Sequence, residues 1–201
     1  DGDVDAAARA YAQARAVADA GAAGRRRMLN VIDSAQSRLW WWDGDFAAIR
    51  PAMLAWLAAH SSSPARATAL TLAALACMHA PAPDCDASLA AQAEHALADP
   101  ALADSLQRVP ATLALAEIAW LERRPAAGIA GLEPLLAQVE PDLGARHSLI
   151  AQMHLLLAAL HAQAGDADTA GRHADLATAA LAYLPESHPL RARSDMYRSL
   201  P

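Results

Sequence analysis

A turn followed by an alanine-rich amphipathic stretch recurs about every forty residues along this chain of 201 residues. The turns are Gly2-Asp3, Gly44-Asp45, Cys85-Asp86, Arg123-Arg124 and Gly165-Asp166. Successive turns are 42, 41, 38 and 42 residues apart. A repeat of this length is typical of solenoids, in which each unit buries its apolar face only against its neighbours. The repeat therefore constrains the fold more than any other feature of the sequence.

A second helical stretch precedes each complete turn, so each repeat is expected to be a helical hairpin. Hydrophobic residues make up 55% of the chain, largely as alanine, and aromatic residues only 4%. Alanine favours helices, whereas the β-branched and aromatic residues that favour strands are scarce. We predict an all-α, right-handed α-solenoid of about four and a half hairpins.

The repeat boundaries follow from the turns. We expect a partial repeat at 1–24, full repeats at about 25–61, 62–99, 100–140 and 141–184, and a capping segment at 185–201 with a short polar helix at 189–199. Because the chain opens in the second half of a repeat and with Asp1, we expect a fragment of a larger protein.

The last repeat, "LAALHAQAGDADTAGRHADLA", resembles the tetratricopeptide repeat (TPR) family. Its matching positions are Leu157, Ala158 and His161 in the first helix, Gly165-Asp166 at the turn, and Ala170, Ala174 and Ala177 in the second helix. The opening "GDVDAAARAYAQARA" is similar to the second half of the same motif. The family repeat is usually about 34 residues, so these repeats are closer to the longer variants of large bacterial regulators. HEAT-like repeats are the structural alternative.

Three consecutive tryptophans, Trp40, Trp41 and Trp42, precede the second turn. On a helix they would cover more than half of the circumference, because neighbours point about 100° apart. A first helix of a stacked array contacts its own partner and both adjacent repeats, so it has no large solvent face. When the first helices are aligned on one another, Trp41 shares a column with Cys77, Trp120 and Ala162. This column either faces a concave groove or fills the core between repeats.

We predict a non-catalytic scaffold that binds a protein or peptide segment in the concave groove, since tryptophan is enriched at binding hot spots. The residues expected to line this groove are Arg38, Trp41, Cys77, Glu117, Trp120 and Gln152. Two alternatives stay open. The chain can be an effector-sensing or regulatory region of a larger bacterial signalling or transcription-regulatory protein, or a self-association module that forms homo-oligomers.

Charge and motifs exclude several other classes. The net charge is −6, which argues against a general nucleic-acid surface. No apolar stretch is long enough to span a membrane. A nucleophile elbow, a phosphate-binding glycine loop and an HExxH motif are all missing from the sequence, so we expect neither an enzyme nor a cofactor. We expect a cytoplasmic protein, with the periplasm as the alternative.

Two groups of potential ligands are interpreted as structural. His147, His154 and His161 share one helix face, but seven residues rise about 10.5 Å, too far for two of them to bind one metal ion. Cys77 and Cys85 lie close to two histidines at a spacing that is no recognised zinc pattern, so no metal is expected there. These cysteines are either buried thiols or, in an exported protein, a disulfide.

Overall fold

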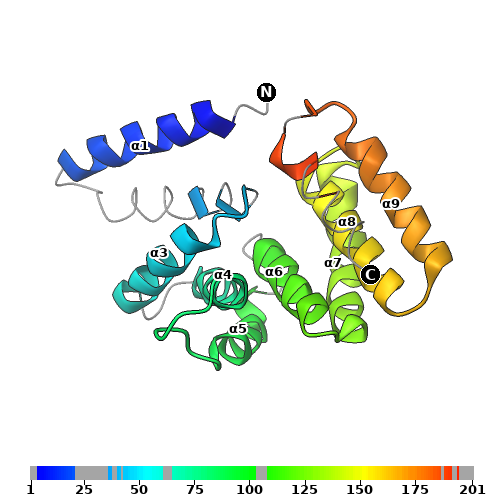
Figure 1. The fold of residues 1–201 in the computed structure, drawn as a ribbon, viewed down its shortest axis with the longest axis horizontal. Coiled ribbons are helices and arrows are strands. Elements are labelled where there is room, and N and C mark those ends of the chain that lie inside the picture. The colour runs from blue at the N-terminus through cyan, green and yellow to red at the C-terminus, as the bar shows by residue number, and fades with distance from the viewer. Residues whose placement is uncertain are drawn as a thin grey trace.

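A computed structural model describes residues 4–20, 36–37, 40–41, 43–60, 65–102, 108–186, 188–191 and 194. In these residues every regular element is helical and no strand is formed. The elements are α1 Val4–Ala20, α3 Phe46–Ala59, α4 Arg66–His79, α5 Leu89–Leu97, the 3₁₀ helix η1 Pro100–Leu102, α6 Arg108–Leu121, α7 Pro125–Leu143, α8 Ser148–Gln163 and α9 Ala167–Leu181 (Figure 1). The predicted all-α class is confirmed for this part of the chain.

The helices pack as successive hairpins, α4 with α5, α6 with α7, and α8 with α9. Neighbouring hairpins join because α3 packs on α4, α7 packs on α8, and α6 contacts both α4 and α8. The first helices α4, α6 and α8 therefore form an inner row. This packing is consistent with a helical repeat.

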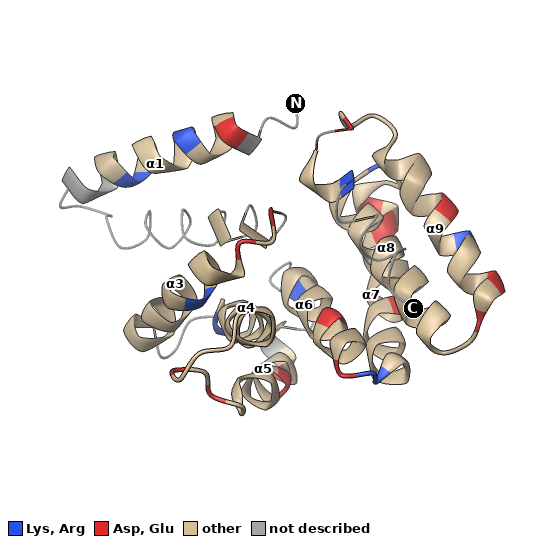
Figure 2. Ribbon diagram, viewed as in Figure 1, with Lys and Arg blue, Asp and Glu red and all other residues tan. Residues whose placement is uncertain are grey.

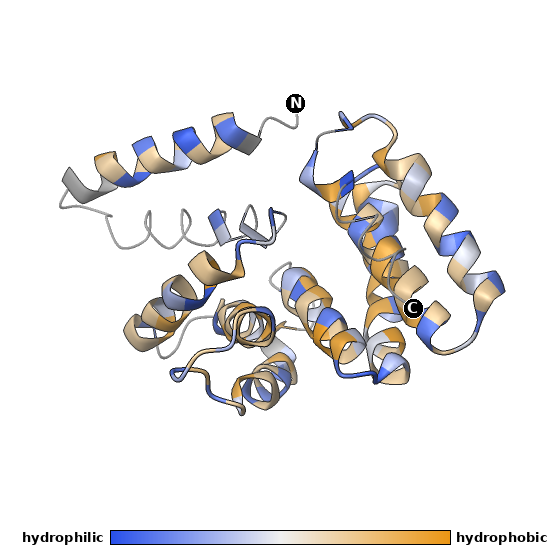
Figure 3. Ribbon diagram, in the orientation of Figure 1, coloured by the Kyte–Doolittle hydropathy of each residue, from blue (hydrophilic) through white to orange (hydrophobic). Residues whose placement is uncertain are grey.

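Burial confirms that a first helix has no broad solvent face. In α4 the ten residues from Ala67 to Ala76 are all buried, and in α8 the eight from Ile150 to Leu157 are. The outer helix α5 buries only Leu89 and Ala93. Hydrophobic colours are accordingly strong where α6, α7 and α8 pack together (Figure 3).

Three of the predicted turns share one backbone geometry. The residues at 44, 123 and 165 have positive φ angles of 73°, 58° and 85°. Each donates its N–H to the carbonyl three residues earlier, and the next residue donates to the carbonyl five before it. This pattern satisfies carbonyls that a helix end leaves unpaired. Arg123 adopts the same left-handed conformation without being a glycine, so the repeat extends to a turn that carries no glycine signal.

Charged residues are most visible at the turns and on the outer helices α1 and α9 (Figure 2). After two of the turns, the side chains of Asp45 and Asp166 accept hydrogen bonds from the N–H groups of Ala48 and Thr169. Pro125 occupies the first turn of α7. Each aspartate therefore caps the helix that follows, because it pairs a donor that the helix start leaves free.

Gly128 marks a close approach between two helices. A Cβ atom added to Gly128 in α7 would lie 2.7 Å from Cδ2 of Leu160, a fully buried side chain of α8. Glycine at this position therefore lets α7 pack directly on α8.

The ends of the chain depart from the hairpin pattern. Helix α9 ends at Leu181, before Pro185, and residues 189–191 are helical, inside the predicted capping helix 189–199. The rest of that helix, apart from Ser194, lies outside the described residues, and so do Arg38, Trp42 and most of the first helix expected in repeat 25–61.

Candidate functional site

The structure places most residues of the predicted groove in the core. The exposed fractions of Trp41, Trp120 and Gln152 are 3%, 7% and 7%, and Glu117 is fully buried. Cys77 is half-buried, and Arg38 lies outside the described residues. The burial of the first four side chains fits the core interpretation of the tryptophan column and not an open groove at these positions. Partner binding by these residues stays a prediction.

Two of the six predicted residues meet directly. The indole Nε1 of Trp41 donates a hydrogen bond of 2.9 Å to Oε2 of Glu117. Trp41 lies three residues before the turn at Gly44, near the end of the first helix of one repeat, whereas Glu117 lies in α6, 76 residues further along the chain. The contact passes over the intervening repeat, so the inner row of helices curves enough for the first helices two repeats apart to touch.

Two further side chains close this site, and we call Trp41, Phe46, His79 and Glu117 the Trp41 cluster. Nε2 of His79, at the end of α4, lies 3.4 Å from Oε1 of Glu117 without an aligned hydrogen bond. Phe46, at the start of α3, stacks on the His79 ring with centroids 3.9 Å apart. A buried carboxylate is costly unless polar partners replace its water, and Trp41 supplies such a partner. The cluster can therefore hold the curvature of the array.

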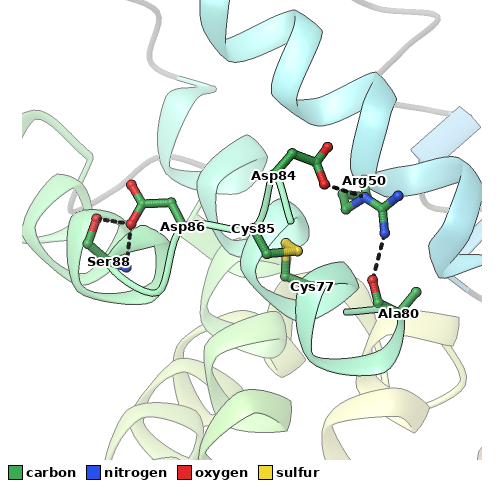
Figure 4. Close-up of a disulfide and its surroundings, with 7 residues drawn as sticks. All are labelled: Arg50, Cys77, Ala80, Asp84, Cys85, Asp86 and Ser88. Atoms are coloured by element: carbon green, nitrogen blue, oxygen red, sulfur yellow. Dashed lines mark hydrogen bonds and ion pairs between the residues drawn. A yellow bond between two sulfur atoms is a disulfide. The ribbon is translucent and has the colours of Figure 1, made fainter. Parts of the chain in front are cut away.

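Cys77 and Cys85 form a disulfide in this structure (Figure 4). The bond ties the end of α4 to the loop that precedes α5. Arg50 of α3 holds the same loop by donating to the carbonyl of Ala80 at 2.7 Å and pairing with Asp84 at 3.4 Å. The redox state that the sequence left open is therefore the bonded one here, and neither cysteine is free to bind metal or a partner.

A histidine cluster links the last two hairpins. Nδ1 of His154 in α8 lies 2.9 Å from Nδ1 of His173 in α9, so one of these nitrogens donates to the other. His161 lies seven residues after His154 on α8, about two helical turns further along. Its Nε2 lies 3.2 Å from Oε1 of Glu133 in α7, and its Nδ1 lies 3.6 Å from Oδ2 of Asp166.

Burial dominates the electrostatics of this cluster. Burial lowers the pKa of His154 below its ordinary value. The pKa of His173 falls from 6.5 to about 4, first because of burial and then because His154 and His161 would repel its positive charge. Both side chains are therefore neutral imidazoles at neutral pH, a form that binds metal ions.

The sequence reasoning considered His154 and His161 but missed His173 and Glu133. The two histidines of α8 are indeed separated along one helix, as their spacing predicted. His173 approaches them from the antiparallel helix α9, and Glu133 approaches from α7. Only the register between helices brings these side chains together, and no local pattern in the sequence reports that register.

An open groove runs across α5, α6 and α7, with a volume of about 340 Å³. Its floor consists largely of small side chains, with Arg108 and Arg124 at the two ends of α6. The lining residues are Glu94, Leu97, Ala98, Arg108, Thr112, Leu115, Ala116, Ala119, Arg124, Ala127, Gly128 and Gly131. We call this surface the α5–α7 groove. The sequence did not predict this groove, because many of its lining residues belong to the second helices α5 and α7 and those on α6 lie outside the tryptophan column.

Comparison of the chain with protein-family models, with curated proteins and with solved structures gives no match. The resemblance to TPR repeats therefore rests on the residues of the last repeat and of the opening segment.

Proposed function

We propose that this chain is a TPR-like, right-handed helical-repeat scaffold that binds a peptide segment of a partner protein and performs no catalysis. The stacked hairpins and the shared turn geometry at 44, 123 and 165 support the repeat assignment. A preformed scaffold suits binding because little conformational entropy is lost when the partner docks.

The α5–α7 groove is the observation that carries this proposal. Its small residues, including Ala119 and Gly131, allow the backbone of a partner to approach closely. The Trp41 cluster, by contrast, fills the concave side at the first helices with the protein's own side chains.

Length and the lining define the partner segment. Helix α6 has 14 residues and so rises about 21 Å, which an extended peptide of about six or seven residues spans. Arg124 is already paired with Glu122, and Glu94 also lines the groove. The segment that fits is therefore a short, largely apolar stretch that packs on the small side chains of the floor.

A matched pair of glycine variants tests the groove. A Cβ at Gly131 meets only Cγ2 of Thr112, at 3.8 Å, and Gly131 lines the groove, so we expect a tryptophan there to fill part of the groove. Gly171, on the outer helix α9, has no atom within 4 Å of such a Cβ and serves as the control.

Peptides are first selected from a random library on the unmodified protein, and their affinities are then measured by fluorescence anisotropy. We expect largely apolar peptides, bound more than about tenfold more weakly by Gly131→Trp and equally well by Gly171→Trp. Equal affinity for all three proteins, or no enriched peptide, would reject the groove as the binding site.

Self-association is the second candidate, and one observation favours it. Val17 on α1 is 68% exposed, so it offers apolar surface that a second copy of the chain can cover. Light scattering over a range of protein concentrations tests this candidate. A mass that rises with concentration and falls back in Val17→Glu supports it, whereas a constant monomer mass rejects it.

The disulfide bears on the compartment. Among the described residues, no helix is both long and apolar enough to cross a membrane. Disulfides persist mainly in oxidising compartments, so the Cys77–Cys85 bond favours the periplasmic alternative over the cytoplasm that we expected from the sequence.

A further inference from the structure

We propose that Glu133, His161 and His173 form a binding site for a divalent transition-metal ion of the zinc type. One side chain comes from each of α7, α8 and α9, and one ligand atom of each lies within 4.8 Å of the other two. Two imidazoles with one carboxylate are a ligand set that suits zinc and its neighbours in the first transition row.

The spacing of the closest pair fits coordination. Two ligands about 2.1 Å from a tetrahedral zinc ion are about 3.4 Å from each other. Nε2 of His161 and Oε1 of Glu133 lie 3.2 Å apart. An ion placed between them needs only small side-chain adjustments, and the exposed carboxylate of Glu133 can supply these.

The outer partners of both histidines are also present. A ligand histidine usually donates its second N–H to a carboxylate or another acceptor, which fixes the ring orientation. Asp166 lies near Nδ1 of His161, at 3.6 Å. Nδ1 of His173 lies against Nδ1 of His154, which leaves Nε2 of His173 to coordinate the ion. His154 in turn has Nε2 3.9 Å from Glu140.

The proposed metal site combines a buried ligand with an exposed one. His161 is buried in the inner row, whereas His173 is half-buried and Glu133 is exposed. The ion can therefore enter from solvent, and a fourth position remains for water. Because α8 packs on both α7 and α9, a bound ion would fasten the last three helices to one another.

Zinc titration of the tag-free, metal-stripped protein by calorimetry tests the site. Reductant is omitted so that the Cys77–Cys85 disulfide stays closed. We expect one zinc ion per chain, and an affinity reduced more than about tenfold in Glu133→Gln, His161→Gln and His173→Gln. The control is His95→Gln, which alters an exposed histidine of α5 and should bind like the unmodified protein.

Two further readouts separate a loss of ligands from a loss of folding. Glu133→Gln changes an exposed side chain, so its circular dichroism should match that of the unmodified protein. Co²⁺ in place of zinc should give visible absorption bands in the unmodified protein that Glu133→Gln weakens. Zinc binding that is absent, that exceeds one ion without saturating, or that is unchanged in the three ligand variants would overturn the proposal.

Discussion

The indole N–H of Trp41 and the carboxylate of Glu117, 76 residues apart, form a hydrogen bond of 2.9 Å inside the core. The bond joins the first helices of repeats that are not adjacent. We therefore expect it to contribute to stability and to the curvature of the array, in addition to local packing.

Trp41→Phe removes the N–H donor and retains an aromatic ring. We expect it to lower the free energy of unfolding by about 2 kcal/mol more than Trp56→Phe, because a buried carboxylate loses its partner. Trp56 is also in the core, 7% exposed, so its substitution controls for the loss of ring volume. Urea unfolding measures both variants. In a double-mutant cycle with Glu117→Gln, a coupling energy near zero would contradict a stabilising Trp41–Glu117 bond.

Gly128→Ala tests the close approach of α7 to α8. Alanine normally gains about 1 kcal/mol over glycine inside a helix, but here its Cβ would displace the buried side chain of Leu160. We expect Gly128→Ala to melt below the unmodified protein and Gly171→Ala, where the space is open, to melt above it. Thermal unfolding followed by circular dichroism gives both values, and two equal increases would show that the helices do not pack at Gly128.

Removing the disulfide should destabilise the protein. The bond spans 8 residues, and closing a loop of this size restricts the unfolded chain by about 2.5 kcal/mol. We expect Cys77→Ser/Cys85→Ser to lose about that much unfolding free energy in urea. Reductant should lower the stability of the unmodified protein and leave the variant unchanged. The same response to reductant in both proteins would mean that the disulfide does not form.

Acid should weaken the fold through His173. The groups that face this side chain are His154 and His161 of α8, Glu133 of α7 and Arg172 beside it on α9. Its pKa is about 4 in the folded chain against an ordinary value of 6.5, so the unfolded chain takes up the proton first. The contribution of neutral His173 to the free energy of unfolding is therefore complete above about pH 6.5 and is lost as the pH drops toward 4.

Urea unfolding in the presence of a chelator, at several pH values between about 7 and 4, measures this dependence. His173→Gln should flatten the curve, whereas His95→Gln should leave it as it is. An unaltered curve in His173→Gln would assign the acid sensitivity to other groups.

The sequence predicted the features that depend on neighbouring residues. Gly44 and Gly165 mark turns because glycine adopts positive φ without strain, and the aspartate after each glycine caps the next helix. Even the turn at Arg123 was located, from the spacing of the repeats. The glycine and aspartate signals lie within a few residues of the turns and helix starts that they specify, whereas the turn at Arg123 was located only from the repeat.

The Trp41 cluster and the histidine cluster depend on which side chains of different helices lie close together. The sequence does not state these distances directly. The column alignment placed Trp41 and Glu117 on inner helices, but only the curvature of the stack decides whether they line a groove or meet in the core. Similarly, His173 joins His161 because α8 and α9 are antiparallel in one particular register. Side-chain packing between helices determines both the curvature of the stack and the register of α8 and α9. No local sequence pattern indicates either of them.

The most direct test of the central claim is a map of peptide binding by NMR, recorded with a peptide selected on the unmodified protein. We predict that the amide signals of Ala119, Gly128 and Gly131 shift, while the indole N–H signals of Trp41 and Trp120 stay in place. Shifts confined to the two indole signals, with those amides unchanged, would contradict the account and return the binding site to the tryptophan column.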